Sequence, residues 1–210
     1  MHLFHTSDTH PARFDRLRDR IAPGAGLVHH VHEDWLDRAR TEGLTGGLVA
    51  EIGAAISAEA GPKLCTCTTI GHIAEAAGAT RIDRPLMEAA ARIGGHVLLV
   101  YCLESTAEGS HQLLRDCIDG AGGSATVERL ALTRLWPIFE SGDLAGFAAA
   151  IAAAVEARLR ALPRPDCIVL AQASMADAAD SLGGYGVPVL TGPELAFRAA
   201  LIGGAPMGGR

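Results

Sequence analysis

Two cysteines and three threonines occupy residues 65–69, and this short stretch contains the side chains best suited to chemistry. An apolar segment precedes it and an alanine-rich segment with helical spacing follows, a pattern typical of a strand that turns tightly into a helix. Backbone N–H groups and the helix dipole at such a turn lower the pKa of a nearby thiol. We therefore expect Cys67 to be partly thiolate near neutral pH and to act as a base or a nucleophile.

The commonest alternative for a cysteine in such a segment is a small, buried apolar side chain. The hydroxyl neighbours and the strand-to-helix setting favour chemistry at Cys67, whereas Cys65, deeper on the same strand face, is expected in the core. A redox or metal site made by these two cysteines is weakly supported, because two thiols on one strand face need further ligands.

The histidine-rich residues 29–34 also invite a metal site, because His29, His30 and His32 stand beside Glu33 and Asp34. Zinc ligands must converge in space, and no second group of His, Cys or Asp residues with ligand spacing supports them. We interpret residues 31–40, which contain His32, Glu33 and Asp34, as a helix with a solvated start and acidic residues in its first turn. The sequence thus predicts no metal site.

Composition limits the class of protein. The chain has 210 residues, 49% hydrophobic content and a formal net charge of -6, so it can bury a substantial core in one large domain or two small ones. Because no basic cluster occurs, nucleic acid and membranes are poor partners and a small solute is a better one. Five cysteines without disulfide-scaffold spacing, and an N-terminus unlike a signal peptide, indicate a cytoplasmic protein.

The elements that must position these residues alternate regularly. Strands are expected at residues 3–6, 26–30, 96–103, 125–132, 167–171 and 187–190 and just before Cys67, and helices at residues 11–21, 43–61, 105–119, 144–162, 175–182 and 194–202. Such alternation predicts an α/β fold with parallel sheets covered on both faces. Ligands of these sheets bind beyond the carboxyl ends of the strands.

An internal repeat divides the chain into two similar halves. The segment that begins at residue 64 has a counterpart that begins at residue 169, so that Cys67 corresponds to Gln172, and residues 3–8 correspond to residues 99–104. If the halves face each other about a pseudo-twofold axis, Cys67 and Gln172 flank one small ligand.

In their order along the chain, these motifs resemble the aspartate/glutamate/hydantoin racemase superfamily over nearly the whole length. The resemblance is carried by the loop with Ser7 after the first strand, the element at residues 67–71, the loop with Ser105 and Thr106, and the element at residues 170–175. It implies two Rossmann-like half-domains with a ligand cleft between them, one formed by residues 1–95 and completed by residues 190–210, the other by residues 96–189. It also implies a cofactor-independent enzyme that acts on amino acids, hydantoins or dicarboxylates.

The second half departs from the family pattern, in which each lobe supplies one cysteine beside the α-carbon. Gln172 stands at that position and has no ionisable proton, while Cys167 lies near the start of its strand. Chemistry with two bases is therefore in doubt, and chemistry with one base remains, with Cys67 catalytic and Gln172 donating a hydrogen bond. The residues expected to bind the carboxylate through hydroxyl and N–H groups are Ser7, Thr68, Thr69, Ser105, Thr106, Ala173 and Ser174.

These observations leave more than one function open. The leading interpretation is a racemase-like isomerase that acts on a small carboxylate without a cofactor. The alternatives are a protein that binds a carboxylate metabolite without turnover, and a lyase or decarboxylase with one base. The expected partner is the carboxylate ligand, and association of copies of the chain is left open.

Overall fold

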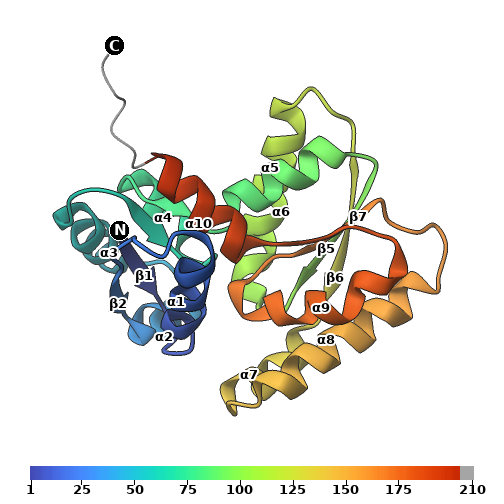
Figure 1. The fold of residues 1–210 in the computed structure, drawn as a ribbon, viewed down its shortest axis with the longest axis horizontal. Helices are drawn as coiled ribbons and strands as arrows, with labels where there is room; N and C mark the ends of the chain where they lie inside the picture. Colours follow the sequence, from blue (N-terminus) through green and yellow to red (C-terminus); the bar gives the residue numbers. More distant parts are fainter. Residues whose placement is uncertain (204–210) are drawn as a thin grey trace. The chain divides into compact units, whose positions relative to one another are not determined.

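The computed structural model describes residues 1–203 and divides into two compact units, which Figure 1 shows in colours that follow the chain. The first unit comprises Met1–Ile82 and the returning chain from Pro193, and the second comprises Asp83–Gly192. Each unit contains a four-stranded sheet whose neighbouring strands run parallel.

The first sheet has the strand order β2-β1-β3-β4. Its strands are β1 (His2–His5), β2 (Val28–Val31), β3 (Lys63–Cys65) and β4 (Thr80–Arg81), and the helices of this unit are α1 (His10–Ile21), α2 (Glu33–Thr41), α3 (Gly46–Ala58), α4 (Gly71–Ala76) and α10 (Gly192–Gly203). Thr45 caps α3, because its side chain accepts a hydrogen bond from the Leu48 N–H. Phe14 of α1 is fully buried and lies against Phe197 of α10, with ring centroids 6.3 Å apart, so the returning helix completes this core.

The second sheet has the strand order β6-β5-β7-β8. Its strands are β5 (His96–Tyr101), β6 (Thr126–Ala131), β7 (Cys167–Leu170) and β8 (Val189–Thr191), its helices are α5 (Arg84–Ile93), α6 (Glu104–Gly120), α7 (Trp136–Glu140), α8 (Leu144–Leu159) and α9 (Ala179–Leu182), and its 3-10 turns are η1 (Thr133–Leu135), η2 (Ala173–Ala178) and η3 (Gly183–Tyr185). All four residues of β7 are buried, as expected for a central parallel strand covered on both faces. Asp143 caps α8 by accepting a hydrogen bond from the Gly146 N–H.

The two sheets share one topology, in which β1 and β3 correspond to β5 and β7. Cys67 and Gln172 each lie two residues beyond the end of the corresponding strand. In both units the residue just before this position donates its backbone N–H to the neighbouring strand. Thr66 donates to the carbonyl oxygen of Phe4 at 2.9 Å, and Ala171 donates to the carbonyl oxygen of Val100 at 3.0 Å. The predicted α/β fold of two similar half-domains with parallel sheets is therefore confirmed, and so is the correspondence of residues 67 and 172. The pseudo-twofold axis and the cleft stay predictions.

Two details differ from the sequence-based description. The boundary between the two units falls before α5, because this helix contacts α6 and β7 of the second unit. The expected lobes of residues 1–95 and 96–189 instead place α5 in the first lobe. Residues 175–182, expected as one helix, form most of η2 followed by α9. Of the expected C-terminal segment 190–210, residues 204–210 lie outside the described part of the chain.

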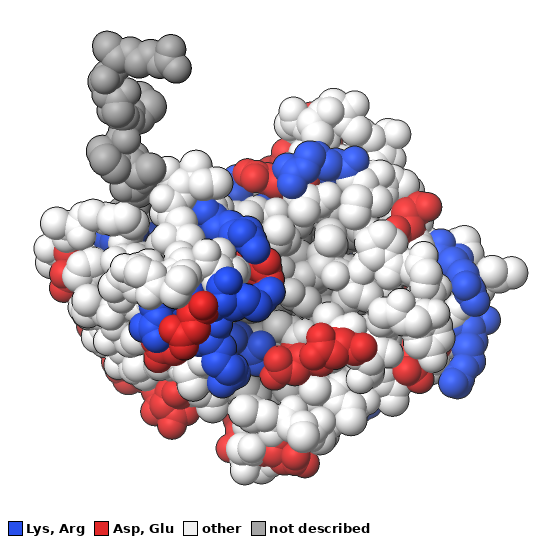
Figure 2. Space-filling view, viewed as in Figure 1, with Lys and Arg blue, Asp and Glu red and all other residues white. Residues whose placement is uncertain are grey.

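Acidic and basic side chains intermingle on the face of the first unit that Figure 2 shows. Several charged side chains of the first unit form ion pairs: Glu194 of α10 pairs with Arg20 at 2.7 Å and with Arg198 at 2.8 Å. Among residues 1–203, no helix is both long and apolar enough to cross a membrane.

Candidate functional site

Cys67 lies just beyond the carboxyl end of β3 in the first sheet, in the turn between β3 and α4. Its side chain is buried and receives hydrogen bonds from the hydroxyl groups of Thr6 and Thr69 and from the backbone N–H groups of Thr69 and Ile70. Thr6 directly follows β1, which pairs with β3, so two adjacent strand ends build the surroundings of the thiol. The arrangement can stabilise a thiolate through four donors.

Burial nevertheless outweighs those donors and raises the pKa of Cys67 above its ordinary value, while the hydrogen bonds from Thr6, Ile70 and Thr69 act in the opposite direction. The expectation of a partly ionised Cys67 is therefore wrong for the free protein, because a buried charge loses its hydration. Burial also raises the pKa of Cys102 to about 12 and that of Cys167 to about 11.

The other cysteine of the motif has a different environment. Cys65 is the last residue of β3, is fully buried, and donates its Sγ–H to the backbone carbonyl of Cys67 at 3.6 Å. Its predicted place in the core is confirmed.

Two of the three hydroxyl residues predicted for the first half lie in the same turn as Cys67. Thr68 and Thr69 are buried beside Cys67, whereas the half-buried Ser7 forms a hydrogen bond with Thr9, with the two hydroxyl oxygens 2.8 Å apart. The hydroxyl that reaches Cys67 from the β1 loop belongs to Thr6, which sequence reasoning passed over. The pairing of β1 with β3 is the signal that could have identified it.

Gln172 holds the corresponding position in the second unit and is also buried. Its Oε1 accepts hydrogen bonds from the backbone N–H groups of Cys102, at 2.6 Å, and Leu103, at 3.2 Å. Leu103 is the N-cap residue of α6, so the Gln172 oxygen satisfies backbone donors at the start of that helix. The amide oxygen is thus committed to the backbone, and the amide nitrogen is the group left to act as a donor.

The remaining predicted residues of the second half vary in exposure. Thr106 is buried and donates its hydroxyl to the Leu103 carbonyl at 2.7 Å, and Ala173 and Ser174 are buried in η2 next to Gln172. Ser105 is exposed. The second unit therefore brings Gln172, Ala173 and Ser174 together along the chain and places Thr106 in the first turn of α6.

A buried histidine network lies behind the cysteine turn, and sequence reasoning missed it. The Thr66 hydroxyl forms hydrogen bonds with Nδ1 of His5, at 2.9 Å, and with Nδ1 of His10, at 3.3 Å, and His5 Nε2 lies 2.8 Å from His29 Nδ1. Burial, with a contribution from the neighbouring His10, lowers the pKa of His5 to about 3. Burial, with a contribution from Arg13, lowers the pKa of His10 to about 4. Both imidazoles are therefore neutral at pH 7.

A buried arginine also lies beside the turn, although the sequence showed no cluster of Arg or Lys near these loops. Arg81 ends β4, and its Nε would be 3.1 Å from a Cβ placed on Gly71, the first residue of α4. Its guanidinium lies 3.9 Å from the Glu75 carboxylate. A glycine at position 71 lets the arginine approach the start of α4.

Comparison with known proteins connects this fold to one class of enzymes. No family model and no curated protein matches the chain. Among solved structures it is similar to glutamate racemase from Francisella tularensis in complex with D-glutamate, at 11% identity and a TM-score of 0.72, covering 96% of this chain and 79% of that one. It is also similar to Picrophilus torridus aspartate racemase, at 12% identity and a TM-score of 0.70, covering 97% and 93% of the two chains.

Allantoin racemase from Klebsiella pneumoniae is a third similar structure, at 18% identity and a TM-score of 0.62, covering 96% of this chain and 85% of that one. The chain therefore has the fold of these racemases, as the sequence resemblance implied. At such identities the likeness concerns the fold, and the chemistry of the chain depends on its own residues.

Proposed function

We propose that this protein is a cofactor-independent, racemase-like isomerase that acts at the α-carbon of a small carboxylate, with Cys67 as base or nucleophile. The observation that carries the proposal is the Cys67 thiol at a parallel-strand end, where hydroxyl and N–H donors from two neighbouring loops surround it. Ligands of parallel α/β sheets bind at that end. The fold shared with glutamate, aspartate and allantoin racemases agrees with this assignment.

Because the pKa of Cys67 is raised, the proposed reaction requires the bound substrate to favour ionisation of the thiol. In the free protein the group is a thiol at neutral pH, and an α-ammonium group bound nearby would favour the thiolate. The thiolate then removes the α-proton and becomes a thiol, and the electron pair left on the α-carbon delocalises onto the carboxylate. If the thiol hydrogen is replaced by a solvent hydrogen before it returns to the carbon, the substrate is regenerated with a solvent hydrogen on the same face, so one base produces exchange without inversion.

Gln172 has a supporting role in this scheme. Its oxygen accepts backbone hydrogen bonds from Cys102 and Leu103, so its amide nitrogen is the group proposed to donate to the developing negative charge. A neutral amide neither gives up nor takes a proton at pH 7, so the wild-type protein is expected to exchange α-protons with little inversion.

The test is solvent deuterium exchange, observed by proton NMR, on a panel of amino acids, hydantoins and dicarboxylates. We expect loss of the α-proton signal of one substrate without inversion, and a decrease in exchange of at least about 100-fold in Cys67→Ser. The matched control is Cys117→Ser, which removes a half-buried thiol of α6 and should leave the exchange rate unchanged. Exchange that persists in Cys67→Ser, or no exchange with any member of the panel, would refute the proposed role.

A carboxylate-binding protein without turnover is the second candidate. The raised pKa of Cys67 and the commitment of the Gln172 oxygen to the backbone favour it. Calorimetric binding of a panel member that undergoes no exchange and no chemical conversion would support this alternative. Release of a smaller product would instead identify a lyase or decarboxylase.

A further inference from the structure

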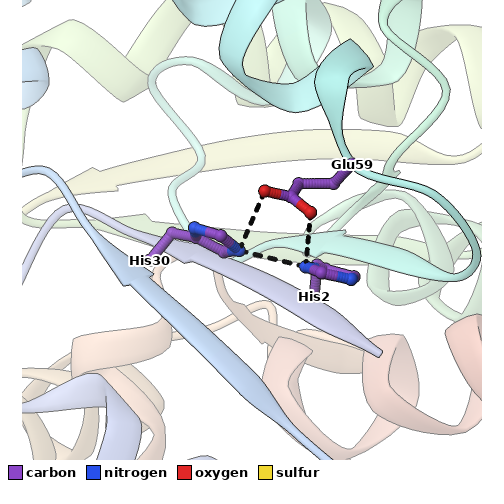
Figure 3. Close-up of side chains that lie close together, drawn as sticks. All are labelled: His2, His30 and Glu59. Carbon is purple, nitrogen blue, oxygen red and sulfur yellow. Dashed lines mark hydrogen bonds and ion pairs between the residues drawn. The ribbon is translucent and has the colours of Figure 1, made fainter.

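Two histidines and a glutamate converge in the first unit, at a distance along β1 from the Cys67 turn. His2 is the first residue of β1, whereas Thr6, which contacts Cys67, follows its last residue. His30 of β2 pairs in register with Phe4, which lies two residues after His2 in β1. The side chains of His2, Phe4 and His30 therefore project from the same face of the sheet. Glu59 is the C-cap residue of α3 and reaches this face, as Figure 3 shows.

The three side chains bring their donor atoms close together. His2 Nδ1 lies 3.0 Å from His30 Nε2 and 3.2 Å from Glu59 Oε2, and His30 Nε2 lies 3.9 Å from Glu59 Oε1. Two ligand atoms bound about 2.0–2.1 Å from a tetrahedral zinc ion are about 3.3 Å apart. The two distances from His2 differ from this value by a few tenths of an ångström. Glu59 presents a different oxygen to each histidine, and the longer distance, to His30, must shorten by about 0.6 Å for the carboxylate to join the ion.

Proton counting makes this arrangement suited to a cation. Because the two ring nitrogens lie 3.0 Å apart, only one of them can carry a hydrogen when both rings are neutral. The other nitrogen and the Glu59 carboxylate are then acceptors, and the ligand atoms of the three residues all lie within 4.8 Å of one another. Burial also lowers the pKa of His30, which favours the neutral, ligating form of its ring.

Neighbouring groups hold the three side chains in place. The His30 ring stacks on Phe4, with centroids 4.7 Å apart and planes 10° apart, and on His2, with centroids 5.3 Å apart. Lys63, the register partner of His2 in β3, places its ammonium 3.2 Å from the backbone carbonyl of Glu59. The imidazoles are thus oriented by stacking, and the lysine is bonded to the backbone near Glu59.

We propose that His2, His30 and Glu59 bind a divalent transition-metal ion, with zinc as the best fit, at a site separate from Cys67. Two histidines and one glutamate form a known ligand set for zinc that leaves a fourth position open to water or another ligand. The side chains of His2 and Glu59 are 21% and 34% exposed, so an ion can enter from solvent. The ligands come from β1, β2 and the end of α3, so the bound ion connects three segments of the first unit.

The experiment is calorimetric titration of untagged, chelator-treated protein with zinc chloride at neutral pH, because an affinity tag rich in histidine would compete. We expect one zinc ion per chain and a higher melting temperature when zinc is added. His30→Gln and Glu59→Gln should each weaken zinc binding at least about tenfold, since even the outer partners of metal ligands are worth about 10- to 100-fold.

Two controls keep the result specific. His111→Gln, which removes a half-buried histidine of α6, should bind zinc as the wild type does. Cys67→Ser should also bind zinc normally, whereas loss of binding in that variant would assign the ion to the thiol and overturn the proposal. His2→Gln, at a part-exposed strand start, repeats the test if His30→Gln does not fold. Absence of binding up to about 1 mM zinc, or full binding by His30→Gln and Glu59→Gln, would also overturn it.

Discussion

Mild acid should destabilise the first unit through two buried histidines, His5 and His10. Their pKa values are lowered to about 3 and about 4, mainly by burial, whereas an unfolded histidine titrates near 6.5. Between these limits the unfolded state binds more protons than the folded state, so stability is fully present above pH 6.5 and is lost as the pH falls. At about 1.4 kcal/mol per pH unit, acidification from pH 7 to pH 5 costs about 2 kcal/mol for each histidine.

The sum for both histidines, about 4 kcal/mol, is a large part of the 5–15 kcal/mol that stabilises a typical domain. Urea unfolding at pH 7, 6 and 5, with a chelator present, measures it. The two units can unfold separately, so the Trp136→Phe background leaves the buried Trp35 as a fluorescent reporter of the first unit. This design separates the effect from pH changes in the second unit.

The decisive comparison is between variants, because other groups also titrate. His10→Gln should reduce the stability difference between pH 7 and pH 5 by about 2 kcal/mol, whatever its absolute stability. His111→Gln is the matched control, since it removes a half-buried histidine of α6 instead. The reasoning is refuted if His10→Gln changes the difference no more than the control, or if the wild-type first unit is equally stable at both pH values.

Three further predictions concern Gln172 and the cysteines. Gln172→Ala should lower the free energy of unfolding of the second unit by about 2–4 kcal/mol in urea titrations, because the N–H groups of Cys102 and Leu103 lose their acceptor; stability equal to wild type would contradict this role. Gln172→Cys should show the same loss while gaining inversion in the NMR assay, because it supplies a second thiol; exchange that still proceeds without inversion would argue against a second base at this position. In native protein, limiting iodoacetamide should label Cys117 before Cys67, because Cys117 is half-buried and Cys67 is buried with a raised pKa; mass-spectrometric mapping that shows the reverse order would contradict this explanation.

The fold could be predicted from the sequence because its signals are local and repeated. Fully buried parallel strands such as β7 read as short apolar runs, and each is followed by a segment with helical spacing. The repeat added the long-range information, since the correspondence of Cys67 with Gln172 follows from comparing two stretches of one chain. The boundary between the two units, which falls before α5, did not follow from the repeat. It depends on the packing of α5 against α6 and β7, which the repeat does not reveal.

The candidate site was harder to predict from the sequence, because its properties depend on contacts between segments that are distant along the chain. The position of Cys67 at a strand end was visible, but its pKa depends on how completely other residues cover it. The backbone bonds of Gln172 depend on the end of β5 lying next to the end of β7. Likewise, the residues proposed to bind zinc come from three separate segments, so spacing around His30 alone could not identify His2 and Glu59.

The placement of α10 has a consequence for how the chain folds during synthesis. The second unit occupies one continuous stretch, whereas the first is interrupted by it and is completed by Phe197, which lies against Phe14. Domains usually fold as units while the ribosome still extends the chain, and the N-terminal one usually folds first. Here the ribosome delivers every residue of the second unit before the first has all of its core, so the N-terminal half can be the last to reach its finished form.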